Sequence, residues 1–181
     1  GHHEVERQLG EDAQRRGEAS ADWHIAKASA LADEVRAQAA SGAAARARML
    51  ASEIEALASK AAQAKGDAAA RAQARVLALV WRAHRDAGSN ADTLARTLDA
   101  FFNALEKVAS PAARAATLRA SAPAGTADAR ERVLAAGAAM VEAAPALPPG
   151  ERFNVLADVS LAASALGVAS RADELARLVF S

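Results

Sequence analysis

Histidine is the residue type in this chain best suited to acid–base or metal chemistry, and two histidines, His24 and His84, are candidates for it. His2 and His3 follow Gly1 at the start of the chain, and we interpret them as the remnant of a purification tag. A serine–histidine–acid site would need His24 or His84, but neither lies in a recognisable catalytic motif. His84 stands near an expected helix end, where a histidine typically caps carbonyl groups or pairs with a carboxylate.

Other catalytic and metal-binding patterns are missing from the sequence. There is no cysteine, which excludes thiolate nucleophiles, thiolate metal sites and disulfides. Glu53 and Glu55 are two residues apart, so on a helix they point to different faces and cannot share a site. The stretch PPGERF lacks the Lys-Ser/Thr of a phosphate-binding loop. We therefore expect no catalytic, cofactor-binding or metal-binding residues, and a protein that is not an enzyme.

The composition predicts an all-α fold. Alanine, the strongest helix former, is the commonest residue, whereas aromatic residues make up 3% of the chain and tyrosine is absent. No apolar run is long enough to span a bilayer, and the N-terminal stretch lacks the apolar core of a secretory signal. We expect a cytoplasmic protein, with export without a cleavable signal as the alternative.

Capping residues, glycines and prolines divide the chain into about eight expected helices. Residues 1–19 are expected to be a flexible polar lead-in, and Ser20 to cap the first helix. Residues 20–65 then form a long alanine-rich hairpin that turns at Ser41 and Gly42. The second helix of the hairpin carries a seam with spacings of three and four, made of Ala43, Ala47, Leu50, Ile54, Leu57, Ala61, Ala64 and Ala68.

The second part of the expected fold is a compact set of shorter hairpins over residues 67–181, which is either a separate domain or continuous with the first hairpin. Gly66 and Asp67 predict a break with Asp67 as the N-cap. One helix over about 43–86 with a tolerated glycine is the alternative. Further caps are expected at Ser89 or Asn90, at Ser110 before Pro111 and at Thr126, and two last helices at roughly 151–166 and 170–180.

An internal echo bears on the architecture. VLALVW at Val76 is echoed by VLADVS at Val155, and ADTLARTL at Ala91 by ADELARLV at Ala172. The echo indicates either a duplicated hairpin, as in a short α-solenoid of the HEAT type, or chance similarity between helices rich in alanine and leucine. The expected fold is accordingly a helical bundle or a short HEAT-like solenoid.

Two features raise the possibility of nucleic-acid binding. Residues 161–178 have the glycine turn of a helix-turn-helix, but Asp173 and Glu174 stand at the start of the second helix, which favours a plain hairpin. Residues 36–85 hold nine basic residues against three acidic ones. This possible basic binding face consists of Arg36, Arg46, Arg48, Lys60, Lys65, Arg71, Arg75, Arg82 and Arg85.

The sequence favours a protein–protein interaction module that acts as a scaffold, an adaptor or a secreted-effector domain. The reason is that the expected helices offer a large surface, whereas the sequence has no catalytic or metal-binding motif. The partner is expected to be another protein, and self-association through the alanine seam is an alternative. Nucleic-acid binding through residues 36–85 is the second hypothesis, and a ligand-sensing or catalytic bundle the third. We expect the large side chains of Trp81, Phe101, Phe102 and Phe153 to pack in the core, and Trp23, with its polar neighbour His24, to be a packing anchor of the first long helix.

Overall fold

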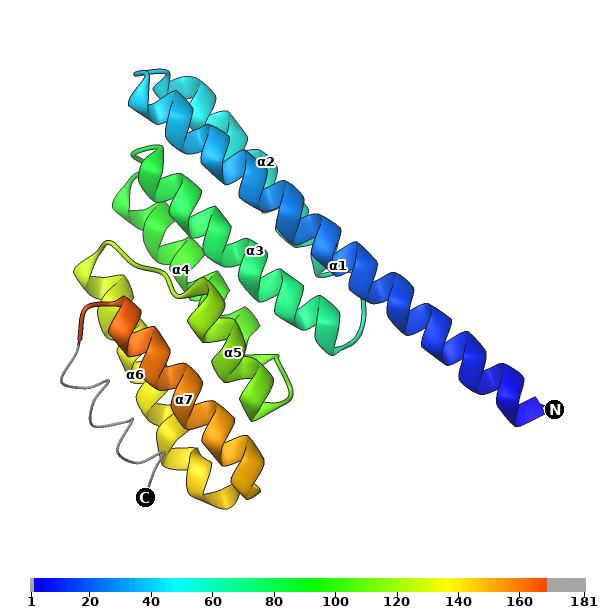
Figure 1. Ribbon diagram of the computed structural model, residues 1–181. Helices are drawn as coiled ribbons and strands as arrows, with labels where there is room; N and C mark the ends of the chain where they lie inside the picture. The colour runs from blue at the N-terminus through cyan, green and yellow to red at the C-terminus, as the bar shows by residue number, and fades with distance from the viewer. Residues whose placement is uncertain (1, 169–181) are drawn as a thin grey trace.

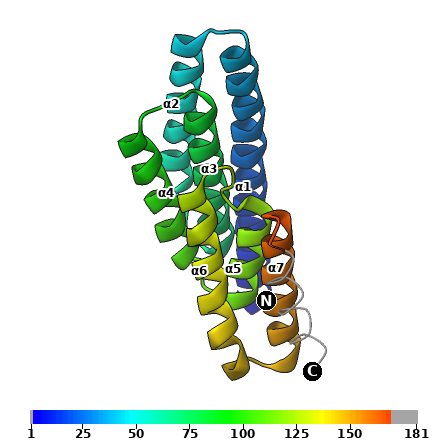
Figure 2. The ribbon, with the colours of Figure 1, turned by 90° about the vertical axis from the view of Figure 1, so that its left-hand side faces the viewer.

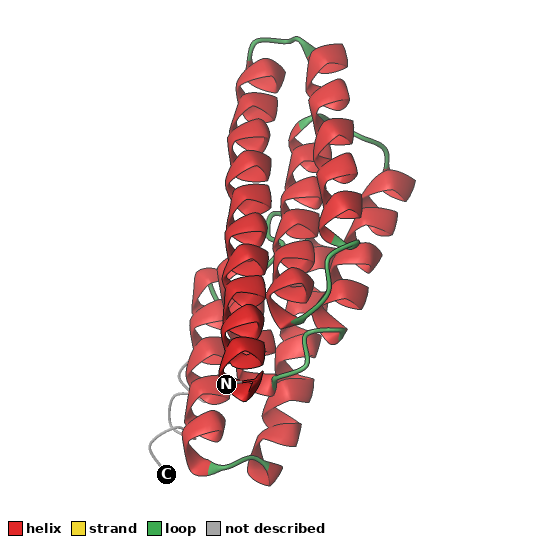
Figure 3. Ribbon diagram, turned by 90° about the vertical axis from the view of Figure 1, so that its right-hand side faces the viewer, coloured by secondary structure: helices red, strands yellow, loops and turns green. Residues whose placement is uncertain are grey.

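The computed structural model describes residues 2–168, which form helices joined by short loops and contain no strand (Figure 3). The expected all-α class is thereby confirmed. The helix expected at 170–180 lies outside the described residues. The helices are α1 (His2–Ala40), α2 (Ala44–Ala61), α3 (Asp67–Asp86), α4 (Ala91–Glu106), α5 (Pro111–Ser121), α6 (Ala127–Ala143), a 3₁₀ turn (Ala144–Ala146) and α7 (Pro149–Ala165).

The helices are arranged in two layers. In one layer α1, α3, α5 and α7 lie side by side, each in contact with the next. On one face of this layer, α2 packs on α1 and α3, α4 packs mainly on α3, and α6 packs on α5 and α7 (Figures 1 and 2). Within residues 2–168, the other face of the layer carries no further helix. The N-terminal part of α1 extends beyond α2 and away from the other helices (Figure 1).

Three helix starts, those of α4, α5 and α6, follow from capping chemistry. The side chains of Asn90, Ser110 and Thr126 each accept a hydrogen bond from the backbone N–H three residues on, which satisfies one of the free donors at the helix start. These three N-caps were expected from the sequence. Of the two candidates before α4, Asn90 is the cap, whereas the hydroxyl of Ser89 contacts a histidine ring instead.

Two expected boundaries were wrong. The first helix begins at His2 rather than after a cap at Ser20, because alanine, glutamate, glutamine and arginine dominate the preceding residues and all favour helix. The break between α2 and α3 is confirmed, but the N-cap is Gly66, with φ of 102°, and not Asp67. Asp67 is the first helical residue, and its carboxylate accepts a hydrogen bond from the N–H of Ala109.

The α2 seam forms the core of the first three helices. Its central residues Ala47, Leu50, Ile54, Leu57 and Ala61 are buried in one cluster or beside it, together with valines of α3. Because alanines at the seam let the helices approach closely, the hairpin packs without large side chains. The ends of the predicted seam do not share this burial, since the helix stops at Ala61.

The large aromatic side chains divide between core and surface. Trp81 and Phe101 are buried as expected, and Phe102 is partly buried against them. The expectation was wrong for Phe153 on α7, which is 48% exposed, and for Trp23 on α1, which is 54% exposed. Trp23 contacts the Nζ of Lys27 through its ring rather than packing in the core, because α2 and α3 pack on a different side of α1.

Candidate functional site

One face of α3 carries four arginines. Arg71, Arg75, Arg82 and Arg85 follow one another at spacings of four, seven and three residues. At 3.6 residues per turn these spacings return to the same side of a helix. Another side of α3, which includes Val76 and Val80, is buried against α1 and α2. The helix therefore presents a line of guanidinium groups away from that core.

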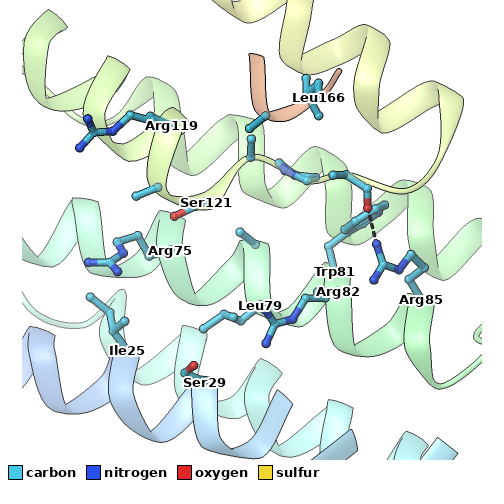
Figure 4. Close-up of a pocket in the computed structure, with 16 residues that line it drawn as sticks. Ile25, Ser29, Arg75, Leu79, Trp81, Arg82, Arg85, Arg119, Ser121 and Leu166 are labelled. Carbon is cyan, nitrogen blue, oxygen red and sulfur yellow. Dashed lines mark hydrogen bonds between the residues drawn. The ribbon is translucent and has the colours of Figure 1, made fainter. Parts of the chain in front are cut away.

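This face of α3 borders two adjoining cavities. The first, of about 380 Å³, lies between α3, α1, the end of α5 and the end of α7 (Figure 4). The second, of about 490 Å³, lies between α1, α3 and α5. Ile25, Arg75, Arg119 and Ala120 line both cavities. The two cavities thus adjoin along α3, mainly between α1 and α5, and we name them together the arginine groove.

Arg75 lies where the two cavities meet. Its side chain is partly buried, and no hydrogen bond or ion pair joins it to another described residue. The other arginines of the groove all have a partner within the described chain. A partly desolvated guanidinium without an acceptor gains more from a bound anion than one already paired. Arg75 is therefore the group of the groove best placed to receive a ligand carboxylate.

Three neighbouring arginines are held by carboxylates that do not line the cavities. Arg71 pairs with Asp67 at 3.1 Å. Arg82 pairs with Asp33 of α1 at 3.2 Å. Arg119 of α5 pairs with Asp158 of α7 at 3.0 Å. These pairs orient the guanidinium groups, and they also offset part of the positive charge along the groove.

Arg85 fixes one end of the groove. Its guanidinium pairs with Asp86 at 2.7 Å, lies 5.3 Å from the centre of the Trp81 ring and donates to the carbonyl oxygen of Ala124 in the loop between α5 and α6. Asp86 also pairs with Arg36 of α1 at 3.5 Å. This chain of contacts joins α1, α3 and the loop after α5, so it sets the positions of both walls relative to the floor.

The rest of the lining is mostly small and apolar. Between the arginines the cavities are lined largely by alanines, with Ile25, Leu79, Trp81, Pro123 and Leu166 as larger apolar groups. Among the described residues, Ser29, Ser121, Thr117 and Asp22 are the other polar groups of the lining, and none of these lining residues is a histidine. The lining thus combines guanidinium groups with small apolar side chains.

The structure does not bring the nine predicted basic residues onto one face. Arg71, Arg75, Arg82 and Arg85 line the groove, and Arg36 approaches its end through Asp86. The remaining four are exposed on α2 or in the loop that follows it, namely Arg46, Arg48, Lys60 and Lys65. Since α2 packs on the opposite face of the layer, these four do not extend the groove.

Arg119 was missed by the sequence analysis because it lies outside residues 36–85 and reaches α3 only through the packing of α5. The line of arginines on α3, in contrast, could be predicted from the sequence alone. Their spacing of four, seven and three residues is visible in the sequence and predicts one helix face.

The second histidine candidate, His84, lies in a buried polar cluster outside the groove. Its Nδ1 is 2.9 Å from the hydroxyl oxygen of Ser89, its Nε2 is 3.4 Å from Oε1 of Glu55, and Arg96 donates to the same oxygen at 2.8 Å. Burial lowers the pKa of His84, opposed by the attraction of Glu55 and reinforced by the charge of Arg96. The expected pairing of His84 with a carboxylate is confirmed.

This cluster resembles a catalytic triad only in residue type. The N–H of Gly88 donates to the carbonyl oxygen of Arg85 and that of Ser89 to the carbonyl oxygen of His84, so both close the end of α3. Neither N–H is free to stabilise an oxyanion. The first histidine candidate, His24, has its Nδ1 2.7 Å from the carbonyl oxygen of Ser20 on the same helix. We therefore assign both histidines structural contacts.

The first half of the helix-turn-helix-like stretch corresponds to the end of α7. There the N–H of Gly167 donates to the carbonyl oxygen of Ser164, and that of Val168 to the carbonyl oxygen of Ala163. These two bonds are the usual closure of a helix by a glycine. The expected second helix, including Asp173 and Glu174, lies outside the described residues.

The described residues contain neither a membrane span nor a metal site. Across residues 2–168, no helix has both the length and the apolar character needed to cross a bilayer. The same part of the chain contains no group of three or more histidine or acidic side chains arranged to hold a metal ion. Comparison of the chain with protein-family models, with curated proteins and with solved structures yields no match in any of the three.

Proposed function

We propose that this protein is a non-enzymatic recognition module that binds an acidic segment of a partner protein in the arginine groove. The observation that carries the proposal is the partly buried Arg75, which has no partner among the described residues and borders both cavities. Arginine at such a position forms short, charge-assisted hydrogen bonds to carboxylates. The apolar alanine surface around it supplies the contact area that a charged pair alone does not.

The charge distribution favours a protein partner over a nucleic acid. A phosphate backbone is bound by a continuous row of cations that release counterions. Here Arg71, Arg82 and Arg119 already face carboxylates, and the unpaired cations of α2 lie on the other side of the layer. A peptide with a few carboxylates needs only the limited positive charge that the groove offers.

The test is fluorescence anisotropy of labelled ligands titrated with the protein. The ligands are a glutamate-rich peptide, its glutamine counterpart and a random-sequence duplex, each at two salt concentrations. The acidic peptide should bind more tightly than the other two. Arg75→Gln should weaken its binding about 10-fold or more, as expected for loss of one charge-assisted hydrogen bond.

Arg48→Gln is the matched control, since Arg48 is an exposed arginine of α2 whose guanidinium likewise has no partner among the described residues and which lies outside the cavities. It removes the same charge and should change the affinity less than about 2-fold. Equal losses in the two variants would show that net charge, not the groove, controls binding. Tighter binding of the duplex with a steep loss in salt would overturn the proposal in favour of nucleic-acid binding.

A further inference from the structure

We infer that the segment bound in the arginine groove is an α-helix that lies along α3 and directs a row of carboxylates at its arginines. This inference rests on the proposed function and specifies the conformation and the charge spacing of the partner. It follows from three properties of the groove: its length, the backbone chemistry of its walls, and the positions of its cations.

The length of the groove matches a helix of ordinary size. Along α3 the lining extends from Ala68 to Arg85. At 1.5 Å per residue this is about 26 Å, or nearly five turns of a second helix. The alanines that dominate the lining allow a close approach, since interaxial distances at small side chains fall toward about 8 Å. A helix with small residues on its inner face can therefore rest between α1 and α5.

Most of the wall surface cannot satisfy the backbone of an extended peptide. It is formed mainly by α1, α3 and α5, whose interior N–H and C=O groups bond within their own helices, and only the loop at 122–124 and the end of α7 depart from this. Side-chain acceptors are few, and the hydroxyl of Thr117 already donates to the carbonyl oxygen of Ala113. An extended peptide pressed into this lining would bury N–H groups without acceptors, which costs free energy. A helix satisfies its own backbone and avoids that cost.

The arginine spacing fixes the pattern of the partner. A helix antiparallel to α3, which also aligns the helix dipoles favourably, meets Arg85, Arg82, Arg75 and Arg71 in that order. Its carboxylates should then stand at spacings of three, seven and four residues. These spacings fall on one face of a helix, with the central pair of carboxylates separated by two turns. The carboxylate opposite Arg75 is expected to contribute most, since that cation has no other partner.

The experiment compares three labelled alanine-based peptides of about 20 residues with the same number of glutamates. The matched peptide places them at spacings of three, seven and four. The scattered peptide distributes them around the helix. The broken peptide keeps the matched positions but carries two central prolines, each of which costs about 3 kcal/mol in a helix. Affinity is measured by anisotropy, and helix content of the bound peptide by circular dichroism.

The matched peptide should bind at least about 10-fold more tightly than the scattered and broken peptides, and should gain helix content on binding. Arg75→Gln should remove this preference, while Arg48→Gln should preserve it. Equal affinity for the matched and broken peptides would overturn the helical inference and leave acidic-segment binding intact. Failure of all three peptides to bind would overturn the proposed function as well, so the two failures are distinguishable.

Discussion

The guanidinium of Arg85 on α3 donates a hydrogen bond to the backbone carbonyl oxygen of Ala124, 39 residues further along the chain. The loop that carries Ala124 continues into Gly125, whose φ of 108° is a conformation that side-chain-bearing residues rarely adopt. A Cβ at this glycine would meet the Nη1 of Arg85. The loop at this end of the groove thus has a backbone conformation that favours glycine, next to the Arg85 guanidinium.

Gly125→Ala should therefore destabilise the protein by about 1–3 kcal/mol, through backbone strain and displacement of the Arg85 side chain. Urea unfolding followed by circular dichroism measures the change. Gly150→Ala is the control, because a Cβ there meets open space and φ is not positive. It should be neutral or slightly stabilising, and a Gly125→Ala variant as stable as this control would contradict the role given to the contact.

A second glycine, Gly137 on α6, lies against α7. A Cβ at this position would stand 2.9 Å from Cγ1 of Val159, a β-branched side chain with little rotational freedom. Overpacking of about 1–3 kcal/mol should outweigh the gain in helix propensity of about 1 kcal/mol, so Gly137→Ala is expected to be net destabilising. Val159→Ala should relieve the clash. A double-mutant cycle by urea unfolding tests this, and additive effects would argue against close packing of α6 on α7.

The buried His84 predicts a pH dependence of stability. Burial lowers the pKa of His84 in the folded protein, despite the nearby carboxylate of Glu55. As the pH falls below about 6.5, the unfolded chain therefore binds a proton before the folded one, and the free energy of unfolding decreases until the pH reaches the folded pKa. The slope contributed by this one group cannot exceed about 1.4 kcal/mol per pH unit.

His84→Gln should make the pH dependence shallower between about pH 7.5 and 5.5, because the variant lacks the titrating group. The quantity to compare is the change in unfolding free energy across that range in the two proteins, since carboxylates titrate in both. Parallel pH profiles for the wild type and His84→Gln would show that His84 is as free to take up a proton in the folded state as in the unfolded one.

Asp158 limits the charge available in the groove, because it pairs with Arg119 at 3.0 Å and is largely buried. Asp158→Asn should release Arg119 and strengthen binding of an acidic peptide roughly 3–10-fold, equivalent to about 1 kcal/mol. Asp99→Asn is the matched control, since it frees Arg132, which lines neither cavity of the groove. Anisotropy should show an effect of the first substitution only; equal gains would point to net charge instead.

The two tryptophans should differ strongly in their contribution to stability. Trp81 is 2% exposed in a cluster with Leu98 and Ala129, so Trp81→Ala should cost about 3–5 kcal/mol. Trp23 is 54% exposed and contacts Lys27, so Trp23→Ala should cost less than about 1 kcal/mol. Unfolding followed by circular dichroism compares both variants, and similar losses would mean that Trp23 has a partner that the described contacts do not include.

The helices were largely predictable because their signals are local. A cap such as Asn90 or Ser110 accepts a hydrogen bond from the N–H three residues away, and Gly66 breaks the helix at its own position. The site was less predictable because its components come together only through packing. Arg119 lines the same cavities as Arg75 only because α5 packs on α3.

Residue type and spacing also could not predict which arginines form ion pairs and which aromatic side chains are buried. Arg75 and Arg82 are chemically identical and seven residues apart on one face, yet only Arg82 meets a carboxylate, that of Asp33 on α1. The same holds for Phe101 and Phe153. Both are phenylalanines on α-helices, but the first is buried among neighbouring helices and the second is exposed. Such differences depend on which helices become neighbours.

The position of α3 has a practical consequence for identifying the partner. This helix contacts α1, α2, α4 and α5, and it also forms the floor of the arginine groove. Its central amides should therefore exchange with solvent only when the whole protein unfolds. A ligand seated on α3 binds the folded state alone, so its binding free energy adds fully to global stability. Candidate partners can accordingly be ranked by the rise in melting temperature that they cause, without a label or an activity assay.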